Sequence, residues 1–282
     1  MSNIDMRDAF FDQFNDMAKN DPNLILLTAD HGAFSLNWLK DNLPYQYYNV
    51  GISEQNMISL SAGLSLGGKK VFAYSIANFI SLRVLEQVSV DLSQMNLPVT
   101  LVGVGAGFTY STDGPTHQGL QDVAAMSSIP NLMILNSSDP VSTRAFAKLD
   151  YSEQGPKYIR IEKGVLPALY PESHDFKPGV FSLRSGVDIT IIATGIMVHR
   201  ALEVADLLER YSVKVGVIDL YRLKPINVSE LLKSLEGSKR VVTLEEHTLT
   251  GGMGSMVLTA LMEHQFWVPV LRLGIMDQHC HY

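Results

Sequence analysis

The stretch Tyr47-Tyr48-Asn49-Val50-Gly51-Ile52-Ser53-Glu54-Gln55-Asn56-Met57 is the most informative part of this 282-residue chain. A hydrophobic strand end leads into a turn of small residues, and the turn opens a helix with an acid, Glu54, in its first turn. This order places Glu54 at the carboxyl edge of a sheet, where open α/β sheets bind their ligands. The alternative is that Glu54 only complements the helix dipole, which contributes less than about 1 kcal/mol.

On both sides of this stretch, apolar runs typical of buried strands alternate with segments of helical periodicity. The runs predict strands at residues 23–28, 70–76, 99–104, 132–136 and 158–161. The periodic segments predict helices over 5–20, from Glu54 onward, over 80–93, from about 118 and from 140. Such alternation implies a mainly parallel sheet covered by helices on both faces.

The alternation stops over residues 165–186, where prolines and glycines stand without a sustained period, and this segment is predicted to be a linker. A second α/β unit follows. Its strands are expected at 188–194, 213–219, 240–244 and 268–273, and its helices near 197–211, 228–235 and 252–264. We therefore expect two doubly wound α/β domains with mainly parallel sheets, residues 1–164 and 187–282.

Composition limits the classes of function. The net charge of -7 argues against nucleic acid or an anionic membrane as a partner. No apolar run is long enough to span a bilayer, and no signal segment opens the chain. The single cysteine, Cys280, excludes an internal disulfide framework. We expect a cytoplasmic protein.

Two glycine-rich stretches follow predicted strands, Gly103-Val104-Gly105-Ala106-Gly107 and Gly251-Gly252-Met253-Gly254-Ser255. Free backbone N–H groups in either stretch could hold an anion. Neither has the spacing of a dinucleotide fingerprint or a Walker motif. Tight packing of the backbone against its neighbours is the favoured interpretation of both.

The stretch Asp113-Gly114-Pro115-Thr116-His117-Gln118 places an acid and a histidine around a rigid turn ahead of a helix. His117 is the residue type suited to proton transfer near neutral pH or to binding a hydroxylated substrate. The alternative is a capped helix start. No second histidine or carboxylate stands at metal-ligand spacing, so no metal site is expected here.

Several motifs together resemble those of transketolases, in the same order and spacing. They are the residues at 51–57, 113–118 and 274–278, Phe79 with Arg83 and Glu86-Gln87, and Glu245-Glu246-His247 before Gly251-Gly252. The resemblance covers nearly the whole chain but only the C-terminal half of a full-length transketolase. The Gly-Asp-Gly motif, by which the family's N-terminal domain holds Mg²⁺ and the cofactor diphosphate, is missing from this sequence. The resemblance implies the pyrimidine-binding and C-terminal domains of a split transketolase.

The resemblance also implies a thiamine diphosphate site shared with a partner subunit. The Mg²⁺ ion would be bound mainly by that partner. Glu54 would bind N1′ of the aminopyrimidine and favour the tautomer that takes the proton from thiazolium C2. Phe79 would pack against the pyrimidine, with Arg83 nearby. Ile76 stands where the family usually has a second aromatic residue.

On the substrate side, the resemblance implies contacts from Asp113 and His117 to sugar hydroxyls, from Arg160 to a terminal phosphate, and from Ser35 near the same end. A histidine that the family has eight positions before Asp113 is Gly105 here, and His31 is a candidate to compensate. This departure points away from an ordinary pentose phosphate and toward a modified sugar.

The implied activity is transfer of a two-carbon ketol unit from a ketose or ketose phosphate to an aldose, by a chain active only with a separate N-terminal subunit, in an α2β2 assembly. Alternatives are a 1-deoxyxylulose-5-phosphate synthase, a 2-oxoacid dehydrogenase β subunit, and a non-catalytic scaffolding subunit. Asp-Gly-Pro-Thr-His-Gln favours a transketolase over the dehydrogenase. Joint presence of Glu54, Asp113, His117 and Arg160 argues against a scaffold.

Overall fold

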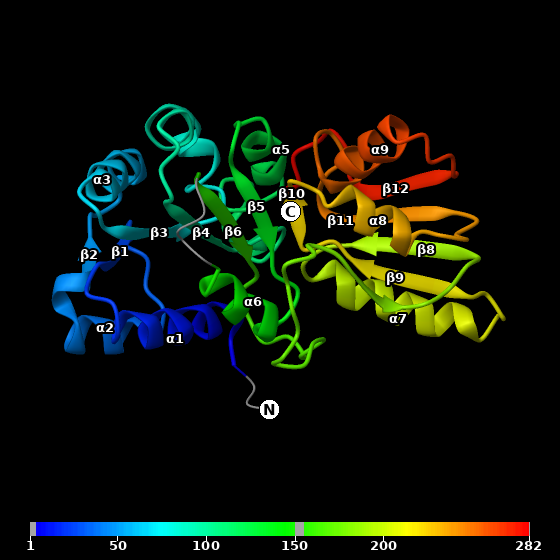
Figure 1. Cartoon of the computed structure of the whole chain (residues 1–282), viewed down its shortest axis with the longest axis horizontal. Coiled ribbons are helices and arrows are strands. Elements are labelled where there is room, and N and C mark those ends of the chain that lie inside the picture. Colours follow the sequence, from blue (N-terminus) through cyan, green and yellow to red (C-terminus); the bar gives the residue numbers. More distant parts are fainter. Residues whose placement is uncertain (1–3, 150–154, 282) are drawn as a thin grey trace.

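A computed structural model describes residues 4–149 and 155–281. Two sheets lie side by side along the long axis of the molecule, each with helices on both faces (Figure 1). The first is a 7-stranded sheet in the order β10-β5-β6-β4-β3-β1-β2. Its strands are β1 (Leu24–Thr28), β2 (Tyr47–Asn49), β3 (Lys70–Ile76), β4 (Thr100–Val104), β5 (Met133–Asn136), β6 (Lys157–Ile161) and β10 (Arg222–Lys224).

Helices pack on both faces of this sheet because its central strands are apolar on both sides. The α-helices are α1 (Met6–Ala18), α2 (Leu36–Asn42), α3 (Glu54–Leu66), α4 (Leu85–Gln87), α5 (Asp122–Ser127) and α6 (Pro140–Ala147). Below the sheet, α1 buries Phe10 and Phe14 against Phe72 of β3. Burial of such a side chain contributes about 1.5–3 kcal/mol, so α1 is firmly anchored.

The second is a 5-stranded sheet in the order β12-β11-β8-β9-β7. Its strands are β7 (Phe181–Arg184), β8 (Ile189–Ala193), β9 (Val215–Asp219), β11 (Val241–Thr248) and β12 (Val270–Ile275). Its helices are α7 (Met197–Glu209), α8 (Val228–Ser234) and α9 (Met253–Glu263). Most strand pairs in both sheets are parallel, which confirms the predicted fold class. The boundaries proposed for the two domains stay a prediction.

Three features differ from the sequence-based expectations. The end of the predicted linker forms β7, which pairs antiparallel with β9. Strand β10 leaves the second unit and pairs antiparallel with β5, so it extends the first sheet. The helix expected over 80–93 is a 3₁₀ turn, η2 (Leu82–Val84), followed by α4 and a π-helical segment, η3 (Val88–Gln94). Sequence periodicity does not distinguish these hydrogen-bond patterns.

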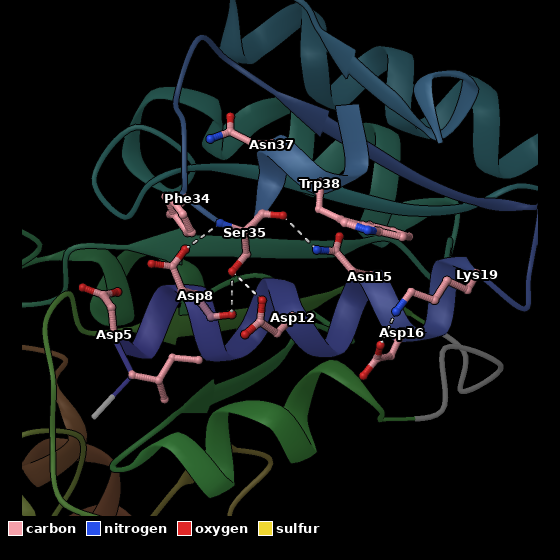
Figure 2. A pocket seen from close by; sticks show the side chains of 11 residues that line it. Asp5, Asp8, Asp12, Asn15, Asp16, Lys19, Phe34, Ser35, Asn37 and Trp38 are labelled. Atoms are coloured by element: carbon pink, nitrogen blue, oxygen red, sulfur yellow. Dashed lines mark hydrogen bonds and ion pairs between the residues drawn. The ribbon is translucent and has the colours of Figure 1, made fainter. Parts of the chain in front are cut away.

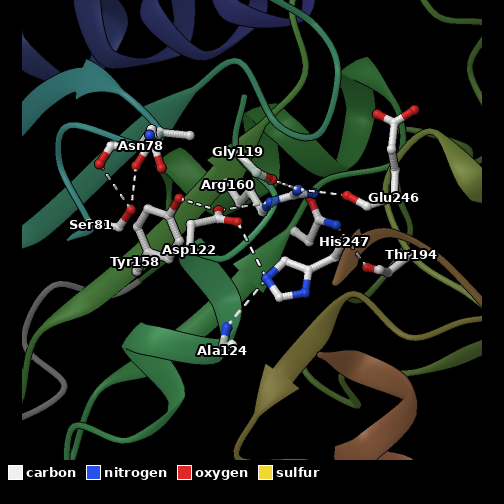
Figure 3. Close-up of polar contacts among 12 residues, drawn as sticks. Asn78, Ser81, Gly119, Asp122, Ala124, Tyr158, Arg160, Thr194, Glu246 and His247 are labelled. Carbon is white, nitrogen blue, oxygen red and sulfur yellow. Dashed lines mark hydrogen bonds and ion pairs between the residues drawn. The ribbon is translucent and has the colours of Figure 1, made fainter. Parts of the chain in front are cut away.

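A buried ion pair of the first unit lies where that unit meets the second, and one of its members also bonds across to the second unit (Figure 3). Arg160 Nε of β6 donates to Asp122 Oδ2 of α5 at 2.8 Å, and the Tyr158 hydroxyl donates to the same oxygen at 2.7 Å. Arg160 Nη2 also donates to the carbonyl oxygens of Gly119 and Glu246, the latter in β11. Each charge is thus paired inside the protein, which is the condition for burying it.

A second buried contact crosses between the units. Asp219, at the end of β9, accepts hydrogen bonds at Oδ2 from Ser138 Oγ at 2.5 Å and from the Tyr170 hydroxyl at 2.7 Å. Burial raises the pKa of Asp219 from 3.8 to about 7, although these two hydrogen bonds oppose the shift. Within the described residues, no helix has the length and apolarity needed to cross a membrane.

Replacing Asp122 with Ala is expected to lower the free energy of unfolding by about 3–5 kcal/mol, because the Arg160 charge would stay buried without its partner. Urea denaturation measures this loss. Asp16→Ala is the matched control, because its ion pair with Lys19 is exposed and is expected to contribute less than about 1 kcal/mol. Equal losses in the two variants would refute the importance given to the buried pair.

Asp219 predicts a pH dependence of stability. Its carboxyl ionises near 3.8 when unfolded and near about 7 when folded, so between these values the folded chain binds more protons. The contribution of Asp219 to stability therefore falls as pH rises from about 4 to 7. Asp219→Asn should flatten this decline, measured by urea denaturation across that range. An unchanged decline in the variant would assign the pH dependence to other groups.

Candidate active site

Glu54 begins α3 shortly after the end of β2, at the carboxyl edge of the first sheet. The turn before it contains Gly51, whose φ of 74° favours glycine. Glu54 is only 2% exposed, and its Oε2 accepts a hydrogen bond of 2.7 Å from Arg83 Nη1. Its Oε1 is buried and has no hydrogen-bond partner among the described residues. An unpaired buried polar atom costs about 1–3 kcal/mol, so a ligand that donates to Oε1 would be stabilised here.

The Phe79 ring lies at the centre of a cluster that includes two histidines. Its centroid is 4.9 Å from that of the His117 ring and 6.3 Å from that of His31. The guanidinium carbon of Arg83 lies 3.9 Å from the same centroid. Since Arg83 also binds Glu54, the structure brings together these five residues, all of them predicted from the sequence.

The two histidines are held in different ways. Burial lowers the pKa of His31, although the nearby Glu54 carboxylate opposes this. His31 is therefore neutral at pH 7 and can both donate and accept a hydrogen bond. The Nδ1 atom of His117 lies 3.0 Å from Thr116 Oγ1. Asn78, just after β3, donates to the Thr116 carbonyl at 2.7 Å and so holds the His117 loop against the sheet edge.

Two other predicted residues border the cluster. Ile76 is the buried last residue of β3, and its carbonyl accepts a 2.9 Å hydrogen bond from the Phe79 backbone. This bond places the Ile76 backbone next to Phe79. Asp113 is exposed and ends the 3₁₀ turn η4 (Ser111–Asp113) in the loop that carries His117. From there its carboxylate can be reached by a polar ligand.

The phosphate-binding role expected for Arg160 conflicts with the structure. Its side chain is 3% exposed, and its guanidinium is bonded to Asp122 and to the carbonyl oxygens of Gly119 and Glu246. The ion pair with Asp122 would have to break before a phosphate could bind. Arg160 is therefore an interdomain structural residue.

Ser35 does not occupy a phosphate-binding environment either. Its hydroxyl donates to Asp12 Oδ1 at 2.5 Å, and its backbone N–H donates to Asp8 Oδ1 at 3.0 Å. Ser35 lines a groove of about 800 Å³ between α1 and the start of α2, and its bonds to α1 are drawn in Figure 2. The acidic residues lining this groove are Asp5, Asp8, Asp12 and Asp16. Like charges there would repel a phosphate.

The sequence analysis missed Arg7, in the first turn of α1. Its Nη1 donates to the Gly32 carbonyl at 3.2 Å, its Nη2 lies 3.9 Å from Asp8 Oδ2, and its Nε is buried without a partner among the described residues. Burial alone would lower the pKa of Arg7, but Tyr74 and nearby carboxylates raise it overall. The Tyr74 ring is 6.3 Å from that of His31, so Arg7 adjoins the Phe79 cluster. A lone arginine in an amphipathic helix gives no sequence signal for such a place.

The glycine-rich stretches serve packing. A Cβ at Gly107 would lie 1.9 Å from Glu246 Oε2. The N-terminus of α9, in the second stretch, already binds an anion of the protein itself, because Glu245 accepts hydrogen bonds from the backbone of Met253 and Gly254. Among the described residues, no group of three histidine, cysteine or acidic side chains is arranged to hold a metal ion.

Comparison with known proteins places the whole chain. The family models described as "Transketolase, pyrimidine binding domain" and "Transketolase, C-terminal domain" match residues 2–168 and 180–282. One relative, a subunit of the apulose-4-phosphate transketolase of Phocaeicola vulgatus, is 36% identical over 98% of this chain and 89% of its own length. Another, a subunit of the 6-deoxy-6-sulfo-D-fructose transketolase of Clostridium sp. (strain MSTE9), is 34% identical over 96% and 85%.

Among solved structures, one described as "Split gene transketolase, inactive beta4 tetramer" has a TM-score of 0.88 and 33% identity, covering 98% of this chain and 90% of that one. The family models, the relatives and this structure therefore agree. The chain belongs to the transketolase family, of which it contains the pyrimidine-binding and C-terminal domains.

Proposed function

We propose that this chain is the C-terminal subunit of a two-chain transketolase, which transfers a two-carbon ketol unit from a ketose donor to an aldose acceptor. The observation that carries the proposal is the unpaired, buried Oε1 of Glu54 beside Phe79 and the two histidines, within the part of the chain that the structure describes. This oxygen differs from other unpaired buried oxygens of the chain, such as Asn15 Oδ1, in its place beside the Phe79 cluster at the carboxyl edge of the sheet. A thiamine diphosphate site explains it.

The residues at this edge fit the family's cofactor. Glu54 would hold an N–H-bearing edge of the aminopyrimidine at Oε1, and Arg83 fixes the carboxylate through Oε2. Phe79 and Ile76 supply the apolar wall. When bound, thiamine diphosphate supplies the carbanion chemistry that no amino-acid side chain can provide. We propose that the diphosphate and Mg²⁺ are held by a partner chain, because this sequence has no Gly-Asp-Gly.

The substrate side follows from the same cluster. His31, which is neutral, and the His117 ring beside it can form hydrogen bonds with the carbonyl and hydroxyl groups of a sugar, and Asp113 can accept from a hydroxyl. The anionic end of the sugar is assigned to Arg7 in place of Arg160. Arg7 contacts Asp8 only at 3.9 Å and keeps a buried Nε–H without a partner among the described residues, whereas Arg160 is bonded to Asp122 at 2.8 Å. The chain's own groups therefore bind and orient the donor.

A partner interface is expected next to the site. Large apolar side chains are exposed on the turn before α3, on α3 and on the segments after β3, among them Ile52, Leu60, Leu82 and Val90. Such patches mark interaction surfaces in soluble proteins. We propose an α2β2 assembly with an N-terminal subunit, in the cytoplasm. The solved relative described as an inactive β4 tetramer supports the need for that second subunit.

The donor is proposed to be a modified ketose with an anionic end. The two relatives are named for apulose 4-phosphate and for a sulfonated fructose, neither of which is an ordinary pentose phosphate. Gly105, in place of the family's histidine, agrees with a change at this end of the site. Assays with ketose phosphates and with pyruvate as donors separate a transketolase from a synthase or dehydrogenase.

Glu54→Gln is expected to lower kcat of the reconstituted two-chain enzyme by about 100- to 10,000-fold, the range for removing a group that assists proton transfer. Glu263→Gln, an exposed change on α9, serves as the matched control and should keep full activity. Circular dichroism and gel filtration with the partner verify folding and assembly. Full activity of an assembled Glu54→Gln enzyme would favour the scaffolding alternative.

Arg7→Met tests the assignment of the anionic end. Loss of hydrogen bonds to a charged group, about 1.5–3 kcal/mol, should raise KM for a phosphorylated donor about 10- to 100-fold. Steady-state kinetics with phosphorylated and unphosphorylated donors measure the difference between them. Arg200→Met is the control, because Arg200 is exposed on α7. A KM that rises equally for both kinds of donor would contradict a phosphate contact at Arg7.

A further inference from the structure

The Tyr110 ring leaves no room for a side chain at position 105, which is a glycine. Gly105 follows β4 with a φ of 94°, and a Cβ built on it would lie 2.1 Å from Tyr110 Cε2 and 2.3 Å from Cδ2. The Tyr110 ring therefore occupies the space into which a side chain at position 105 would project. This is the position at which the resemblance to transketolases predicted a histidine. A phenol thus stands in this chain where an imidazole was expected.

The surroundings of Tyr110 connect it to the proposed substrate site. Its ring centroid is 6.5 Å from that of His117, and Lys163 Nζ lies 5.0 Å from the Tyr110 centroid. Burial raises the pKa of Tyr110, and the nearby Arg7 charge opposes this. The phenol is therefore neutral at pH 7, with an O–H that can donate. It lies beside the histidine assigned to sugar hydroxyls and near the arginine assigned to the anionic end.

We propose that Tyr110 is a specificity-determining residue that contacts the distal carbons and anionic group of the ketose donor. The inference rests on the proposed function and deepens it. Compared with the expected histidine, Tyr110 lacks an imidazole that can carry a positive charge. It supplies a bulkier, neutral hydrogen-bond donor with an apolar ring edge. The site is thereby suited to a donor with an anionic end whose distal carbons differ from those of a pentose phosphate.

The test uses the reconstituted two-chain enzyme with two kinds of donor. Hydroxypyruvate passes on the same two-carbon unit while its carboxylate leaves as CO₂, and it has no distal carbons. Ketose phosphates have both distal carbons and an anionic group. Tyr110→Phe should raise KM for the best ketose phosphate about 10-fold more than KM for hydroxypyruvate, because one hydrogen bond to the anion is lost. Tyr110→Ala should change the order of preference among ketose phosphates.

Tyr45→Phe is the matched control, because Tyr45 is 85% exposed, and its two KM values should stay in the wild-type ratio. If Tyr110→Phe also keeps that ratio and Tyr110→Ala keeps the order of preference, the role given to Tyr110 is refuted while the proposed function stands. If the wild-type assembly turns over neither kind of donor, the proposed function itself fails, and the role of Tyr110 fails with it.

A stability measurement tests the steric premise separately. Gly105→Ala should lower the melting temperature more in the wild-type background than in Tyr110→Ala, because the overlap with the ring disappears while the strain of positive φ remains in both. Equal losses in the two backgrounds would overturn the claim that the ring fills the space beside position 105.

Discussion

The buried guanidinium of Arg160 connects the two domains, because it is paired with Asp122 of the first domain and donates to the Glu246 carbonyl of the second. Burying these charges removes several kcal/mol of hydration per ion, and the structure offsets this with hydrogen bonds from Arg160 to two carbonyl groups, one in each domain. An arginine committed in this way cannot also grip a substrate. A substrate anion therefore needs another residue to bind it. Arg7 is the candidate, because its guanidinium Nε has no partner within the described part of the chain.

The position of the second domain has a direct effect on the site. Arg160 of β6 donates to the Glu246 carbonyl of β11. The Glu246 side chain reaches the loop that carries Tyr110 and His117, where its Oε2 accepts a hydrogen bond from the Phe108 backbone at 2.9 Å. Gly107 lies under the same carboxylate, and no side chain would fit there. The C-terminal domain thus shapes the loop that carries His117, while the five residues of the Glu54 cluster described above all come from the first domain.

Local sequence motifs predicted the position of a residue where that position depends only on neighbouring residues in the chain. Glu54 follows a strand and opens a helix, so its place at the sheet edge could be inferred without any distant contact. Arg160 could not be placed in this way, because its partner Asp122 lies 38 positions earlier and pairs with it only through the fold. Ser35 failed for the same reason, since the aspartates around it come from α1. Strand β10 was missed because three residues carry no periodicity.

The buried Glu54 oxygen without a hydrogen-bond donor among the described residues lowers the stability of the fold. Natural sequences satisfy nearly all buried polar atoms, so an acceptor of a residue only 2% exposed, with no donor among the described residues, is an expected site of function. Arg83 binds one oxygen of the Glu54 carboxylate and also lies over the Phe79 ring, while the other oxygen has no partner among the described residues. The same edge exposes apolar side chains such as Ile52. An unsatisfied acceptor beside an uncovered apolar surface is what half of a site shared between two subunits requires, and this single constraint accounts for both features.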